Sequence, residues 1–117
     1  MYKIIILMIL NLLSFSAVAN CNKSNVYESI SCYEKELRSS KTLLNQSYKK
    51  QYLALDTDGK LILEKSQKAW INYKNSHCDE LVAYLATQVQ GGGSKLINLS
   101  CNTQLTNERI KQLDDLD

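Results

Sequence analysis

The sequence predicts an all-α protein, namely a three-helix up-down-up bundle stapled by two disulfides. Apolar residues recur every three or four positions, which is the period of an amphipathic helix. The chain has no proline and only 4 glycines, so the turns that a β domain of this size needs are missing. With 117 residues it is long enough for one hydrophobic core but too short for a two-domain, cofactor-binding enzyme.

The N-terminal segment is typical of an export signal. A short basic start precedes an apolar run over residues 4–13, and small residues follow at 17–19. The apolar run is about half of the ~20 residues that a membrane-spanning helix needs. We therefore expect a secretory signal peptide over residues 1–19 and one domain over residues 20–117. The domain is expected in the periplasm or outside the cell. Asn20 stands where lipid attachment would need a small residue, so no membrane anchor is expected after cleavage.

All the cysteines follow this predicted signal: Cys21, Cys32, Cys78 and Cys101. An even number in a small exported domain indicates two disulfides. Four cysteines allow three pairings, and the pairing that closes the shortest loops joins Cys21 to Cys32 and Cys78 to Cys101. A tight corner at the glycines would place Cys101 level with Tyr84, too far from Cys78 for a bridge. The second bridge therefore requires residues 88–97 to be partly irregular.

The first helix is predicted to be long and to end at a turn over residues 56–59, where Gly59 would take a positive φ. Two caps are possible at its start, one pairing Asn25 with Glu28 and the other Ser31 with Glu34. Its apolar face comprises Val26, Ile30, Tyr33, Leu37, Leu44, Tyr48 and Leu55.

The second helix is predicted to begin near Lys60 and to end before the triglycine, because glycine costs about 1 kcal/mol per residue inside a helix. Its inward stripe is expected to comprise Leu63, Trp70, Tyr73, His77, Leu81 and Tyr84. The last helix carries Leu96, Leu99, Leu105, Ile110, Leu113 and Leu116. We also expect Asn45 and Gln67 to form a hydrogen bond between the first two helices.

Reactive groups do not converge in the sequence. The four side chains from His77 to Glu80 diverge around a helix, so they cannot bind one metal ion, and a disulfide-bonded Cys78 is no nucleophile. The net charge is +2, with acidic and basic residues interleaved, which does not indicate nucleic-acid binding. Serine precedes lysine in the run from Gly91 to Lys95, the wrong order for a phosphate-binding loop. No catalytic residue, metal or cofactor is predicted.

Several of these features together resemble the LprI-type lysozyme inhibitor family. They are the signal segment, the four cysteines, the Gln67-Lys68-Ala69-Trp70-Ile71 run, the Gly-Gly-Ser corner and the Leu105-Thr106 pair followed by Arg109. The resemblance implies a helical, disulfide-linked domain of the bacterial envelope that binds and blocks lysozyme. The family motif falls on Asn45, Tyr48, Gln67, Trp70, Tyr73, Thr106 and Arg109, which we interpret as structural residues.

The leading functional hypothesis is therefore a protein that inhibits a lysozyme-type muramidase by occupying its cleft, without chemistry of its own. A glycine corner approaches a narrow cleft closely, and a cation beside it faces the enzyme's two carboxylates. The candidate partner-binding residues are Gly91, Gly92, Gly93, Ser94 and Lys95. Because animal lysozymes are basic, the acidic tail over residues 114–117 is a further candidate contact. The alternatives are a periplasmic structural, stress or immunity-type module for another protein, and a small hydrolase.

Overall fold

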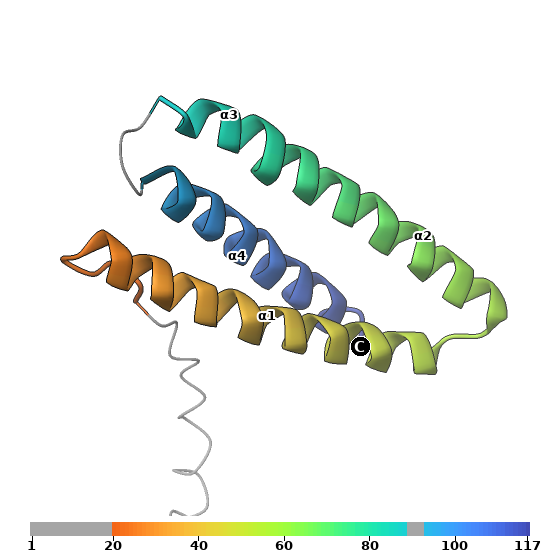
Figure 1. Cartoon of the computed structure of the whole chain (residues 1–117). Coiled ribbons are helices and arrows are strands. Elements are labelled where there is room, and N and C mark those ends of the chain that lie inside the picture. Colours follow the sequence, from red (N-terminus) through yellow and green to blue (C-terminus); the bar gives the residue numbers. More distant parts are fainter. Residues whose placement is uncertain (1–19, 89–92) are drawn as a thin grey trace, which may run out of the picture.

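The computed structural model describes residues 20–88 and 93–117. Within these ranges the chain is helical and has no strand. The elements are α1 (Val26–Ala54), α2 (Thr57–Lys74), η2 (Asn75–Val82), α3 (Ala83–Ala86) and α4 (Gly93–Asp114). The segments α2, η2 and α3 follow one another without a break and form one long helix. The described residues therefore make the predicted three-helix up-down-up bundle, with α4 between α1 and the long helix (Figure 1). The predicted signal segment lies outside the described residues.

The start of α1 distinguishes between the two predicted caps. The side-chain oxygen of Asn25 accepts a hydrogen bond from the backbone N–H of Tyr27 at 2.8 Å, and Asn25 itself has extended backbone angles. This is the geometry of a helix N-cap, which satisfies one of the free amide groups of the first turn. The helix then runs for 29 residues.

The turn between α1 and α2 differs from the prediction. Helix α2 begins at Thr57 rather than near Lys60, and Gly59 lies inside its first turn instead of ending the preceding helix. Asp56 is the N-cap, because its carboxylate accepts a hydrogen bond from the Gly59 N–H at 2.8 Å. The sequence was misread because an aspartate before a helix is a strong start signal, which outweighs the ability of glycine to stop one.

The hydrophobic core lies where the three helices meet near the α1–α2 turn. Leu44 of α1, Leu63 of α2 and Leu113 of α4 are buried together. Four half-buried side chains pack around them: Tyr48, Tyr52, Trp70 and Ile110. This cluster draws one leucine from each helix, so it fixes their relative positions at this end of the bundle.

The seam between α1 and α4 is lined by small polar residues. Ser40 and Ser47 of α1 and Thr103 and Thr106 of α4 are all buried. The Ser40 hydroxyl donates a hydrogen bond to Asn107 Oδ1 at 2.6 Å across the seam. The Thr103 and Thr106 hydroxyls bond to carbonyls one turn earlier in α4. Small side chains that satisfy their own polar groups let the two helices approach closely.

The inward face of the long helix is not the predicted stripe. Tyr73, Leu81 and Tyr84 are 56%, 52% and 69% exposed, whereas Cys78 is fully buried. Tyr73 lies in α2, next to the inward position at Lys74. For Leu81 and Tyr84 the cause is η2, a π-helical segment whose turns contain more residues than α-helical turns. A regular α-helical period through this segment reaches His77, but the wider turn places the next residue, Cys78, inward.

Both predicted disulfides, Cys21–Cys32 and Cys78–Cys101, are confirmed. Of the segment expected to be partly irregular, residues 93–97 are helical because α4 begins at Gly93, and residues 89–92 lie outside the described residues. Cys78 lies eight residues before the end of α3, and Cys101 lies eight residues after the start of α4. The two cysteines are therefore level across the corner. A corner centred on the glycines would instead have put Cys101 opposite Tyr84.

Candidate partner-binding surface

The predicted binding corner lies at the end of the bundle where α3 stops and α4 and α1 begin (Figure 1). Gly91 and Gly92 are outside the described residues. Gly93 and Ser94 are half-buried, and Lys95 is exposed. The structure thus places the described part of the corner at an accessible end of the molecule.

Lys95 forms an ion pair with α1. Its Nζ lies 2.8 Å from Glu34 Oε1, and both side chains are largely exposed. The hydrogen bond from Lys95, together with its charge, lowers the pKa of the Glu34 carboxyl. An exposed pair of this kind exchanges readily with water or with another carboxylate. Lys95 therefore remains available to a partner that offers a better acceptor.

A polar network braces the corner behind the Cys78–Cys101 bridge. Asn98 Nδ2 donates to the Cys78 carbonyl at 3.1 Å and to Asp79 Oδ1 at 3.0 Å. Asn102 Nδ2 donates to the same Asp79 oxygen at 2.9 Å, and its Oδ1 accepts from Lys74 Nζ at 2.9 Å. These bonds join the long helix to α4 on the same level as the disulfide.

The surroundings of Asp79 and Lys74 shift the pKa values of both groups. Burial opposes ionisation of Asp79, but the hydrogen bonds from Asn102 and Asn98 and the charge of Lys74 outweigh it, so the pKa of Asp79 is lowered. Burial lowers the pKa of Lys74, and the nearby Asp79 carboxylate partly offsets this. The two groups are thus held as an ionised pair with Asn102 between them.

The cluster from His77 to Glu80 does not converge. The His77 ring stacks on Tyr73 with ring centroids 5.6 Å apart, while Cys78 is bonded to Cys101. Asp79 turns toward α4, where Asn98 and Asn102 bind it. Over residues 20–88 and 93–117, no group of three or more His, Cys, Asp or Glu side chains is arranged to hold a metal ion.

Most residues of the family motif make contacts between helices, and others lie on the surface. Arg109 Nε donates to Gln67 Oε1 at 3.0 Å and its Nη2 to the Ser66 hydroxyl at 3.0 Å, which ties α4 to α2. Gln67 is thus bound to Arg109 and not to Asn45, which is exposed. Thr106 is buried in the seam, and Tyr48 and Trp70 pack on the leucine core. Tyr73 faces outward instead of into the bundle.

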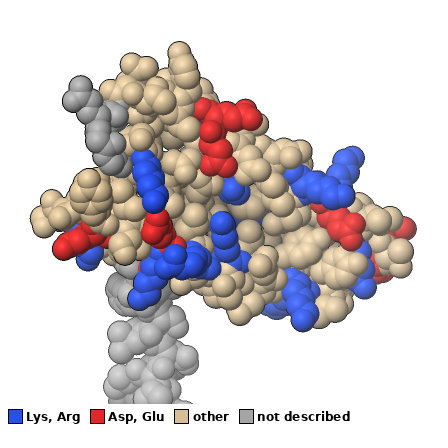
Figure 2. Space-filling model, in the orientation of Figure 1, with Lys and Arg blue, Asp and Glu red and all other residues tan. Residues whose placement is uncertain are grey.

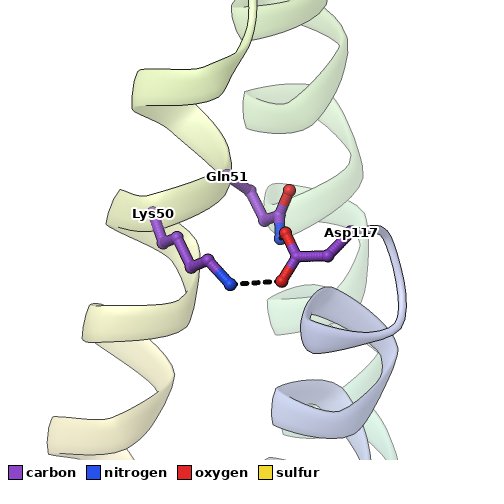
Figure 3. A network of polar contacts seen from close by, with 3 residues as sticks. All are labelled: Lys50, Gln51 and Asp117. Carbon is purple, nitrogen blue, oxygen red and sulfur yellow. Dashed lines mark hydrogen bonds and ion pairs between the residues drawn. The ribbon is translucent and has the colours of Figure 1, made fainter.

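The acidic tail lies at the opposite end of the bundle from the corner (Figure 1). Asp117 forms an ion pair with Lys50, and its other oxygen accepts from Gln51 Nε2 at 2.9 Å (Figure 3). The hydrogen bonds from Lys50 and Gln51 lower the pKa of Asp117. The tail is therefore fastened to α1, and it cannot enter the same narrow cleft as the glycine corner.

Two surface features were missed by the sequence analysis. The first is the exposed outer side of the long helix, which was assigned to the core. The second is a groove of about 450 Å³ between α1 and α4, lined by Tyr33, Glu36, Ser100, Thr103, Gln104, Asn107, Glu108 and Lys111. No local pattern marks the groove, because its walls come from separate helices. Cations and carboxylates are interspersed over the face seen in Figure 2, which shows no extended patch of one sign.

Over the described residues the fold defines a class of protein: a small helical domain braced by two disulfides. A family model described as "Lysozyme inhibitor LprI" matches residues 19–113. The chain therefore belongs to the LprI lysozyme inhibitor family, and this membership suggests lysozyme inhibition. Neither the curated proteins nor the solved structures gave a match.

Proposed function

We propose that this protein is exported to the bacterial envelope, where it binds a lysozyme-type muramidase and blocks it by occupying the cleft. The observation that carries the proposal is the family match over residues 19–113. Inhibition of this kind requires a complementary shape and no reactive group. Two disulfides within a small domain suit an oxidising compartment outside the cytoplasm. None of the helices described is long and apolar enough to cross a membrane.

The corner over residues 91–95 is the segment that we assign to the cleft. Muramidases cleave the glycosidic bond with two carboxyl groups placed on either side of it. In the complex, the Lys95 ammonium group leaves Glu34 and pairs with one of these carboxylates. The start of α4 at Gly93 adds the positive end of a helix dipole on the same side.

The bracing of the helices on either side of the corner supports the same assignment. The Cys78–Cys101 bridge and the Asp79 network fix the two helices that lead into and out of it. Helices held in place before binding lose less conformational entropy in the complex. The corner is thus presented to a partner by a fixed frame.

The test is a muramidase assay with purified protein, using one animal and one bacterial-type lysozyme. Saturable inhibition by wild type is expected, and Lys95→Ala should weaken it by roughly tenfold, the loss of one charge-assisted contact. Lys49→Ala removes an exposed lysine of α1 far from the corner and serves as the matched control. Absence of inhibition of both enzymes at protein excess would overturn the proposal.

If inhibition is intact but Lys95→Ala and Lys49→Ala behave alike, the corner is not the inserting segment. A bulky substitution at Gly92 provides a second check, because a larger side chain blocks close approach of the backbone. Its folding is verified by the helical circular dichroism signal. Unchanged potency of a folded Gly92→Trp variant would assign inhibition to another surface.

A further inference from the structure

The outer side of the long helix carries a row of mostly exposed side chains. This outer row consists of Ile62, Ser66, Ala69, Tyr73, His77, Leu81 and Tyr84. Ile62 and Tyr84, at its two ends, are each 69% exposed, and the large apolar members between them are more than half exposed. Helix α4 reaches the edge of the row at Ser66, whose hydroxyl accepts a hydrogen bond from Arg109 Nη2, and His77 is half-buried.

The spacing of the outer row is that of a helix-packing seam. Successive members lie three or four residues apart from Ile62 to Tyr84. At 1.5 Å per residue the row is about 33 Å long, enough for roughly three heptads of contact with another helix. A row of exposed apolar residues with this period indicates a protein-binding face.

The row is complementary to itself when two copies run antiparallel. With Tyr73 on the two-fold axis, Ile62 of one copy faces Tyr84 of the other. In the same register, Ala69 faces His77. The small Ala69 then lies opposite the stacked Tyr73–His77 rings, so that small and large side chains alternate across the contact.

The charges beside the row select the same arrangement. Lys65 and Glu80 are both exposed, and each directly precedes a member of the row, Ser66 and Leu81 respectively. In an antiparallel pair, the flanking positions on one edge of each helix meet each other. Lys65 of one copy therefore faces Glu80 of the other at both ends of the contact. In a parallel pair opposite edges meet, so Lys65 and Glu80 would not face each other.

We propose that this protein forms an antiparallel homodimer through the outer row, with Tyr73 at its centre and two Lys65–Glu80 ion pairs at its edges. This inference is independent of the muramidase proposal. Antiparallel pairing places the two glycine corners at opposite ends of the dimer, so each copy keeps its corner accessible. The partner of the row is thus a second copy of the same chain, and the assembly presents two equivalent corners.

The test is sedimentation equilibrium of the purified protein from low micromolar to about millimolar concentration. Wild type should show a reversible monomer–dimer equilibrium. Tyr73→Arg places two cations on the two-fold axis and should weaken association by about 30-fold or more, the effect of losing a central contact. Tyr27→Arg changes an exposed tyrosine at the start of α1, outside the row, and should leave association unchanged.

A charge swap tests the orientation. Lys65→Glu creates two like-charge contacts and should weaken the dimer by roughly tenfold, whereas the double variant Lys65→Glu/Glu80→Lys should restore it to within about threefold. Both residues are exposed, so the swap remains informative if Tyr73→Arg does not fold. A wild-type monomer at every concentration, or a double variant as weak as Lys65→Glu alone, would overturn the proposal.

Discussion

Removing the Cys78–Cys101 bridge should affect both stability and inhibition, whereas removing Cys21–Cys32 should affect mainly stability. The two bridges hold different parts of the chain. Cys21–Cys32 ties the segment before α1 back to that helix, while Cys78–Cys101 joins the two helices that flank the corner. The pairwise alanine variants Cys21→Ala/Cys32→Ala and Cys78→Ala/Cys101→Ala therefore form a matched set.

The expected magnitudes follow from the loops that the bridges close. The sequence separations are 11 and 23 residues. In the chain-entropy description, these loops correspond to about 2.8 and about 3.4 kcal/mol of the free energy of unfolding. Either loss is a large part of the roughly 5–15 kcal/mol that stabilises a small domain. The difference in stability between the two variants is small, so a much larger difference in inhibition would reflect the position of the bridge.

Urea unfolding followed by circular dichroism gives the two free energies, and the muramidase assay gives the inhibition constants under conditions where both variants are folded. We expect Cys78→Ala/Cys101→Ala to weaken inhibition by roughly tenfold or more through loss of preorganisation, and Cys21→Ala/Cys32→Ala to change it little. Equal losses of inhibition would refute the assignment of this bridge to the corner. Unchanged stability in both variants would refute the entropic calculation.

Three further outcomes test the packing and electrostatics. Asp79→Asn should destabilise the protein at neutral pH, and the difference from wild type should shrink as the pH falls below the ordinary aspartate pKa of 3.8. The pKa of Asp79 is lowered in the folded protein, so its carboxylate stabilises the fold at any pH above the unfolded-state pKa. This stabilisation is lost as the pH falls through the folded-state pKa. Urea midpoints measured across this pH range follow the loss. Leu113→Ala should cost about 2–5 kcal/mol of unfolding free energy, because the side chain is 1% exposed, whereas Leu116→Ala, at 63%, should cost under about 0.5 kcal/mol. Gln67→Ala should cost about 1–3 kcal/mol because it leaves a half-buried guanidinium short of an acceptor, and thermal unfolding should show Asn45→Ala to be nearly neutral.

The fold class and the disulfide pairing were predictable because each rests on a strong local signal. Apolar spacing indicated the helices, and short loops favoured the pairing of Cys78 with Cys101 that the structure contains. Element boundaries were less predictable. At Asp56 and Gly59 two turn signals compete within four residues, and only the hydrogen bond from the Gly59 amide shows which of them sets the helix start.

The candidate site was predictable only in part, because contacts between helices have no local pattern. Gln67 and Arg109 were both singled out as motif residues, but their mutual hydrogen bond joins positions 42 apart in the chain. Lys95 was predicted as a cation at the corner, whereas its pairing with Glu34 depends on where α1 begins relative to α4. The sequence thus identified the residues, and the packing of the helices decided their partners.

The inward placement of Cys78 and Ala86 has a cause that a deletion can test. From Trp70 onward the inward positions are Lys74, Cys78 and Ala86, which are spaced by four or eight residues. An α-helix turns once in 3.6 residues, so this spacing stays on one face only if some turns contain more residues. Deleting Ser76, an exposed residue of η2, should return this segment to α geometry and rotate the following residues by about 100° relative to α2.

With Ser76 deleted, Trp70 and Cys78 can no longer both face the bundle. Either Trp70 leaves the leucine core or Cys78 turns away from Cys101, so unfolding free energy should fall by about 3 kcal/mol or more. Ser76→Ala retains the residue count and should be nearly neutral because the side chain is exposed. Urea unfolding and a free-thiol assay measure the two effects. A deletion variant with wild-type stability and no free thiols would show that the π-helical segment does not set which residues face the core.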